Sequence, residues 1–208
     1  MKTDAELAHL CRLAYQEVDC TVYHLQFIVR TTELANYIGI RGTDFENRWF
    51  EGNYWDLIRN ARFAPWRSRA TGWVHKGYLN GAQHLYEHLR SHCHADLFDK
   101  PIIIAGHSMG AAVGALLAQM LEFDDHLVAR LVMFGSPRVY WSKPQFHCAV
   151  THYRNGSDII TSVHPFYKLP APVTQLGSTS NAFNIFDHSI RHYVAALKAL
   201  EHVEAPPA

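Results

Sequence analysis

The fold is decided by the stretch Ile102-Ile103-Ile104-Ala105-Gly106-His107-Ser108-Met109-Gly110, which joins two elements through a serine turn. Its first four residues are apolar, as is typical of a short buried strand, and the small residues over 111–118 are typical of a helix. The glycines on either side remove Cβ atoms that would clash in a sharp strand-to-helix turn. Such a turn strains the serine backbone and exposes its hydroxyl above the sheet. We therefore interpret Ser108 as a nucleophile, at a helix N-terminus whose amide groups suit a developing oxyanion.

Helices and short apolar strands alternate on both sides of this turn. We expect helices over 4–18, 75–92, 109–121 and 189–200, and strands over 21–30, 33–42, 56–63, 102–106, 128–134, 149–154 and 173–176. The alternation predicts an α/β fold with a mostly parallel central sheet and helices on both faces. The short connection between the first two strands predicts an antiparallel edge region. No linker divides the chain, so we expect a single domain over 1–208 with a frayed tail at 204–208.

The composition excludes several classes of function. Among 208 residues, 19 are basic and 19 acidic, which leaves no basic footprint for nucleic acid. No apolar run is long enough for a transmembrane segment, and no signal peptide opens the chain, so we expect a cytoplasmic protein. The four cysteines lack metal spacing and are interpreted as reduced thiols, with a Cys11–Cys20 bridge left open.

Three of the fifteen histidines, His84, His88 and His92, share one face of the helix expected over 75–92. Two or three such imidazoles suit a transition metal, but no acidic or cysteine ligand completes an obvious set. A solvated histidine face is therefore the favoured interpretation. We expect neither a metal nor an organic cofactor.

A nucleophilic serine needs a base, and the base needs an acid that fixes its tautomer. After a turn of this kind the chain order is serine, then acid, then histidine. Asp158 directly follows the strand expected over 149–154, at the carboxyl end where sites of α/β sheets lie. Asp124 and Asp125 follow the next helix, at the opposite end, and Asp187 would have to fold back. Asp158 is therefore the predicted acid.

The base is chosen among three late histidines. His188 stands just before the last helix, in a loop position that reaches back over the sheet. His164 follows Asp158 closely, and His192 lies one helical turn beyond His188. We favour His188, with His164 and His192 as open alternatives.

Six motifs, in this order, resemble those of the class 3 lipases, the fungal-lipase-like branch of the α/β-hydrolases. They are Y-I-G-I-R-G-T at 37–43, V-H-K-G-Y at 74–78, G-H-S-M-G at 106–110, F-G-S-P-R-V at 134–139, D-I-I at 158–160 and D-H-S at 187–189. The resemblance runs from about residue 37 to 193. It implies an α/β-hydrolase fold and a serine carboxyl-ester hydrolase, a lipase or esterase that degrades lipid or short-chain esters.

The resemblance also implies a role for each matching position. Ser108, Asp158 and His188 would form the catalytic triad. The backbone N–H groups of Thr43 and Met109 would form the oxyanion hole. Phospholipase A activity or acyl transfer is the alternative within enzymes, and a catalytically silent binding module is the alternative outside them.

The sequence departs from the family pattern at positions that concern substrate binding. Ala111 stands where the family commonly has a second glycine. The family's lid would fall in the stretch over 44–73, which is rich in aromatic residues and arginines. Two interpretations of this stretch are open. In the first, its part over 64–72 is a mobile flap that contacts a lipid interface transiently. In the second, the aromatic residues of the stretch pack on the core. The second interpretation is favoured, which implies an open pocket and soluble or short-chain esters.

Overall fold

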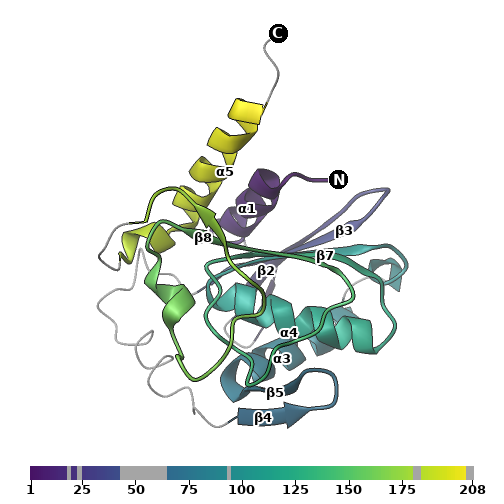
Figure 1. The fold of residues 1–208 in the computed structure, drawn as a ribbon. Coiled ribbons are helices and arrows are strands. Elements are labelled where there is room, and N and C mark those ends of the chain that lie inside the picture. Colours follow the sequence, from purple (N-terminus) through teal and green to yellow (C-terminus); the bar gives the residue numbers. More distant parts are fainter. Residues whose placement is uncertain (18–19, 23–24, 43–64, 93–94, 180–183, 205–208) are drawn as a thin grey trace.

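A seven-stranded sheet forms the centre of the computed structural model, which describes residues 1–17, 20–22, 25–42, 65–92, 95–179 and 184–204 (Figure 1). The strands run in the order β1-β2-β3-β6-β7-β8-β9. They are β1 (Cys20–Val22), β2 (Leu25–Thr31), β3 (Asn36–Ile40), β6 (Ile102–His107), β7 (Val128–Phe134), β8 (Ala149–Asn155) and β9 (Thr174–Leu176). The pairs from β3 to β9 are parallel, whereas β1, β2 and β3 pair antiparallel. The predicted parallel sheet with an antiparallel edge is confirmed.

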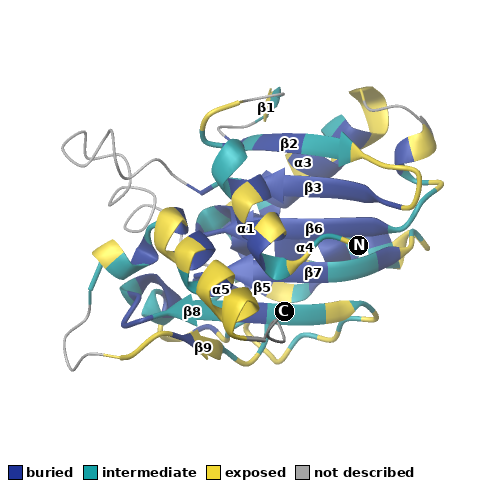
Figure 2. Cartoon of the chain, turned by 90° about the horizontal axis from the view of Figure 1, so that it is seen from above, coloured by how far each residue is buried: buried dark blue, intermediate teal, exposed yellow. Residues whose placement is uncertain are grey.

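Two pairs of helices cover the two faces of the sheet. Helices α1 (Asp4–Leu13) and α5 (Ile190–Glu204) lie together on one face, and α3 (Lys76–His92) and α4 (Met109–Phe123) lie on the other (Figure 1). The buried residues divide accordingly: Ile102 and Ile104 of β6 belong to the core beneath α3 and α4, and Ile103 and Ala105 to the core beneath α1 and α5. This alternation explains why β3 and β6 are dark throughout in the burial view and β7 is dark over most of its length (Figure 2).

A small hairpin lies outside the main sheet. Strands β4 (Pro65–Ser68) and β5 (Gly72–His75) pair antiparallel, and isolated bridges join Val74 to Tyr140 and Tyr140 to Lys168. The residues over 65–72, which only the less favoured of the two interpretations made part of a mobile flap, form a paired hairpin. Residue 64 and the rest of the expected lid, over 44–63, lie outside the described residues.

Two other element predictions are wrong in detail. The strand expected over 21–30 is two antiparallel strands, with Val22 opposite Leu25. The β-branched and aromatic composition continues from 21 to 30 without a glycine or proline that would mark a break. The first helix ends at Leu13 rather than near 18. The strand expected over 56–63 falls outside the described part of the chain.

The remaining global features concern helices and thiols. No helix within the described ranges is long and apolar enough to span a bilayer. Cys11, Cys20 and Cys148 are free thiols, so the Cys11–Cys20 bridge that the spacing left open is not formed.

Candidate active site

Ser108 occupies the turn between β6 and α4. Its φ of 57° and ψ of −128° lie in a region that residues with a side chain rarely adopt. The turn is held from both sides, because the Ser108 amide donates to Phe134 O at 2.9 Å and Ser108 O accepts from the Ala111 amide at 3.0 Å. A Cβ on Gly106 would lie 2.5 Å from the backbone oxygen of Gly110, so only glycine fits there. The sequence predicted this strained serine turn.

An acid and a base meet at the same end of the sheet. Asp158 follows β8 and precedes a short 3-10 helix (Ile159–Ser162), and His188 ends another (Phe186–His188). His188 Nδ1 and Asp158 Oδ2 lie 2.7 Å apart, and both side chains are buried. A carboxylate accepts, so Nδ1 carries the proton and Nε2 is the ring's acceptor. The pair has the geometry of an acid that orients a general base.

Two further groups hold the Asp158 carboxylate. Tyr193 OH donates to Oδ2 at 2.6 Å, and the Ile160 amide donates to Oδ1 at 2.8 Å. Burial alone would raise the pKa of Asp158, but the charge of the His188 ring and these hydrogen bonds outweigh it and hold the pKa below its ordinary value. Asp158 is therefore kept as an anion beside His188.

The other candidates for the base lie elsewhere. His164 Nε2 lies 3.1 Å from Tyr78 OH, and His192 Nδ1 donates to Phe186 O at 2.8 Å. Of the three candidate histidines, His188 is the one whose ring bonds to Asp158.

The other candidate acids have structural partners. Asp187 accepts from the Ser157 amide at 2.8 Å, and so braces the loop that carries Asp158. Asp124 accepts from Tyr86 OH beyond the far end of α4.

Sequence reasoning missed the role of His107, which links three parts of the site. Its Nε2 donates to His188 O at 2.8 Å, so its Nδ1 is the acceptor, 2.7 Å from Tyr15 OH. Tyr15 OH in turn accepts from the Gly42 amide at 2.9 Å. Burial, reinforced by the charge of His188, lowers the pKa of His107 to about 3. The only sign of this uncharged bridging residue in the sequence is the histidine of G-H-S-M-G.

The predicted oxyanion donors are described only in part. Met109 begins α4 directly after Ser108, at the helix end where backbone amides lack intrahelical acceptors. Thr43 lies outside the described residues. Its neighbour Gly42 packs so closely on Ser108 that a Cβ there would collide with the Ser108 Cβ. The end of β3 therefore lies against the serine turn.

The histidines of α3 contact one another and the neighbouring strand β1. His88 stacks on His92 with centroids 4.4 Å apart, and Cys20 Sγ lies 3.0 Å from His88 Nε2. Within the described ranges, no group of three or more metal-ligating side chains is arranged around a common point.

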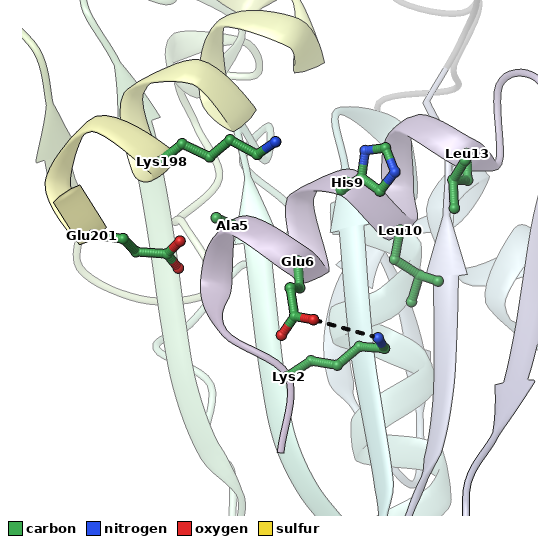
Figure 3. Close-up of a pocket in the computed structure, with 8 residues that line it drawn as sticks. All are labelled: Lys2, Ala5, Glu6, His9, Leu10, Leu13, Lys198 and Glu201. Carbon is green, nitrogen blue, oxygen red and sulfur yellow. Dashed lines mark ion pairs between the residues drawn. The ribbon is translucent and has the colours of Figure 1, made fainter.

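A groove between α1 and α5 is separate from this chemistry (Figure 3). Its volume is about 200 Å³, and none of Ser108, Asp158 and His188 lines it. Its lining includes Lys2 and Glu6, which pair at 3.8 Å. Because its charges are exposed and partly paired with each other, we assign it no role.

Comparison with known families identifies most of the chain. The family described as "Lipase (class 3)" matches residues 37–168, which include Ser108 and Asp158 but end before His188. No match was found among curated protein sequences.

Solved structures give the same fold. The triacylglyceride lipase of Rhizomucor miehei is 16% identical, with a TM-score of 0.61, and the alignment covers 90% of this chain and 94% of that one. A nonglycosylated lipase of Yarrowia lipolytica is 19% identical at a TM-score of 0.59, over 83% and 78% of the two chains. A triacylglycerol lipase whose catalytic centre is a serine protease triad is 17% identical at 0.59, over 90% and 94%. This chain belongs to the class 3 lipase family and has the α/β-hydrolase fold.

Proposed function

We propose that this chain hydrolyses carboxylic esters of lipids or short-chain acids through an acyl-enzyme on Ser108. The observation that carries the proposal is the buried Asp158–His188 pair, 2.7 Å apart, at the same sheet end as a serine held at φ 57°. The ring of His107, the residue before Ser108, stacks on His188, so the serine turn and the base are adjacent. Family membership and the triacylglycerol lipases with this fold support the same reaction class.

The first half-reaction forms the acyl-enzyme. His188 Nε2 takes the proton from Ser108 Oγ as that oxygen attacks the ester carbonyl. Asp158 holds Nδ1–H and stabilises the imidazolium that forms. When the tetrahedral intermediate collapses, the ester C–O bond breaks, and His188 returns the proton to the leaving alcohol.

The second half-reaction releases the acid. Water attacks the acyl carbonyl, His188 takes its proton, and Ser108 leaves with that proton restored. The backbone amides of Met109 and Thr43 are proposed to donate to the oxyanion in both steps. Loss of one such donor typically costs about 10²–10³ in kcat.

A fluorophosphonate probe tests the proposal directly. We expect the folded chain to be labelled on Ser108, and Ser108→Ala to remain unlabelled at the same probe concentration. Absence of label on the folded wild-type chain would contradict the enzyme and favour a silent binding module.

A series of esters tests the substrate class. Hydrolysis of short and long acyl esters, each followed below and above its micellar limit, separates an esterase from a lipase. A rate increase at the interface with long chains indicates a lipase that acts on aggregated lipid. Saturation by monomeric short-chain esters, without such an increase, indicates an esterase.

A further inference from the structure

A thiol and an imidazole meet between strand β1, at the edge of the sheet, and helix α3 (Figure 2). Cys20 Sγ lies 3.0 Å from His88 Nε2, and both residues are partly exposed. A neutral imidazole nitrogen accepts from a thiol, so the ring is placed to take the proton of Cys20. A nucleophile with a base in hydrogen-bond reach is the arrangement that activates a cysteine for attack.

Two neighbouring rings fix the orientation of His88. His92, one helical turn further along α3, stacks on it with centroids 4.4 Å apart and an angle of 9° between the planes. The ring of Phe27 meets His88 edge-on, with centroids 5.7 Å apart. Phe27 is also the cross-strand partner of Cys20, so the two side chains lie on the same face of the sheet. Packing from β2 and α3 therefore holds the base beside the thiol.

The protonation state of His88 suits a base. Burial, reinforced by the charge of His92, lowers the pKa of His88 below its ordinary value. The ring is therefore uncharged at neutral pH. Because Nε2 accepts from the thiol, Nδ1 carries the ring proton, and Nε2 has a lone pair for the proton of Cys20.

The other two described thiols have surroundings that disfavour reaction. Cys11 is fully buried, and burial raises the pKa of its thiol. Cys148 is partly exposed, but burial and the Glu122 carboxylate beside its thiol raise the pKa there as well. A raised pKa leaves less thiolate, which is the reactive form of cysteine. Among the described thiols, Cys20 is the one that faces a base.

Cys20 cannot form a disulfide with either of these thiols. Cys11 belongs to the core beneath α1 and α5, whereas Cys20 packs against the core on the other face of the sheet. Cys148 directly precedes β8, five strand spacings from β1, or about 24 Å. A disulfide needs Cα atoms within about 7 Å of each other. Neither described thiol therefore supplies the second sulfur.

We propose that Cys20 is a modification site at which low-molecular-weight disulfides form a mixed disulfide, with His88 as the base. His88 Nε2 takes the proton from Cys20 Sγ as that sulfur attacks one sulfur of the disulfide. The S–S bond of the reagent breaks, a new S–S bond to Cys20 forms, and the leaving thiolate takes the proton from His88. The Cys20 sulfur is oxidised and the leaving sulfur is reduced, so the disulfide is the only co-reactant. Ser108 takes no part in this exchange.

The experiment follows the reaction of glutathione disulfide with the full-length, folded Cys93→Ser chain. Cys93 lies outside the described residues, and its replacement leaves the three thiols whose positions are known. Peptide mass mapping of samples quenched with acid gives the rate of modification at each cysteine. We expect Cys20 to react at least about tenfold faster than Cys148, which is also partly exposed but faces a carboxylate.

Substitution of the base tests its role. His88→Gln, in the same background, removes the imidazole and keeps a polar side chain, so the rate at Cys20 should fall about tenfold. The rate at Cys148 should not change. His9→Gln is the matched control, because it makes the same change at an exposed histidine of α1, and its Cys20 should react like that of the parent chain. Far-UV circular dichroism and the thermal midpoint show that each variant is folded.

Unfolding gives a test that needs no further substitution. In concentrated urea the rates at Cys20 and Cys148 should converge, because the unfolded chain no longer holds His88 beside Cys20. Equal rates at these two thiols in the folded chain, or an unchanged rate at Cys20 in folded His88→Gln, would overturn the proposal. So would a preference for Cys20 that persists in urea, because it would come from the local sequence rather than from the fold.

Discussion

The ring of His107 stacks on the ring of His188, with centroids 4.7 Å apart and an angle of 29° between the planes. The same His107 donates from Nε2 to the His188 backbone oxygen at 2.8 Å. Two residues therefore hold His188 in place. Asp158 bonds to its ring, and His107 contacts both its ring and its backbone oxygen. Because burial keeps the pKa of His107 near 3, it places no positive charge beside the base at neutral pH.

Replacement of His107 tests it as a positioning residue. His107→Phe keeps an aromatic ring but removes both hydrogen bonds, so we expect kcat to fall up to about 100-fold, because small misplacements of reacting groups are this costly. KM should stay within about twofold, because His107 acts through His188 rather than on substrate. Steady-state kinetics with a soluble ester measures the changes in kcat and in KM separately.

The matched control is His75→Phe, the same change at a buried histidine of β5 outside the candidate site. Its kcat should equal that of the wild type. A large rise in KM for His107→Phe, with kcat unchanged, would contradict the positioning role.

The Tyr15 hydroxyl couples the end of β3 to His107. Tyr15→Phe removes the acceptor for the Gly42 amide and the partner of His107 Nδ1. We expect the free energy of unfolding to fall by about 1–3 kcal/mol. Turnover should fall as well, since Gly42 packs on Ser108. Urea unfolding and ester hydrolysis on the same preparation measure both.

Tyr86→Phe provides the comparison, because it removes a tyrosine hydroxyl that donates to Asp124 at the opposite end of α4. This variant should lose stability without loss of kcat. Equal losses of kcat in the two variants would mean that Tyr15 acts only through global stability.

Gly135 leaves room for the acid and the base. Its φ is 61°, and an added Cβ would lie 2.5 Å from Asp158 Oδ2 and 2.9 Å from His188 Nδ1. Gly135→Ala should therefore separate the pair and lower kcat/KM by at least about 100-fold. Gly177→Ala shares the strained backbone, at φ 66°, but its nearest neighbour is 3.7 Å away. It should lose about 1 kcal/mol of stability and keep its activity. Loss of activity in both would show that backbone strain, not the collision, is responsible.

The central part of the fold could be predicted because its signals are local. Strand β7 over Val128–Phe134 has the predicted bounds, since an apolar run that is interrupted only by Arg130 is closed by Gly135-Ser136-Pro137. The strained turn at Ser108 follows from the motif and its flanking elements. Strand ends then place Asp158 at the correct end of the sheet, because parallel strands share that end.

The contacts that support the site could not be predicted, because they join distant positions. Tyr15 and His107 are 92 residues apart, and Tyr193 and Asp158 are 35 apart. Tyr193 follows an ordinary helical pattern, and its hydroxyl reaches Asp158 only because α5 packs beside the carboxyl end of β8. No periodicity or spacing encodes such a contact before the fold is known.

Buried histidines make the stability of the fold depend on pH. Burial is the main cause that lowers the pKa of His75 and of His152 from 6.5 to about 4, and that of His107 to about 3. Between 6.5 and these values the unfolded chain binds protons that the native chain does not. Stability is therefore greatest above about pH 6.5 and falls as the pH decreases, by up to about 1.4 kcal/mol per pH unit for each histidine.

His75 gives the sharpest test of this dependence. Neither of its ring nitrogens has a hydrogen-bond partner within the described residues, and its ring packs against Tyr78 and His164 with centroids 4.6 Å away. His75→Phe replaces it with an apolar ring of similar shape, so stability at about pH 8 should be equal or higher. Between about pH 6 and 4.5 the slope of unfolding free energy against pH should fall by up to about 1.4 kcal/mol per unit. Urea unfolding across this range measures the slope, and an unchanged slope would mean that His75 is already protonated in the native chain.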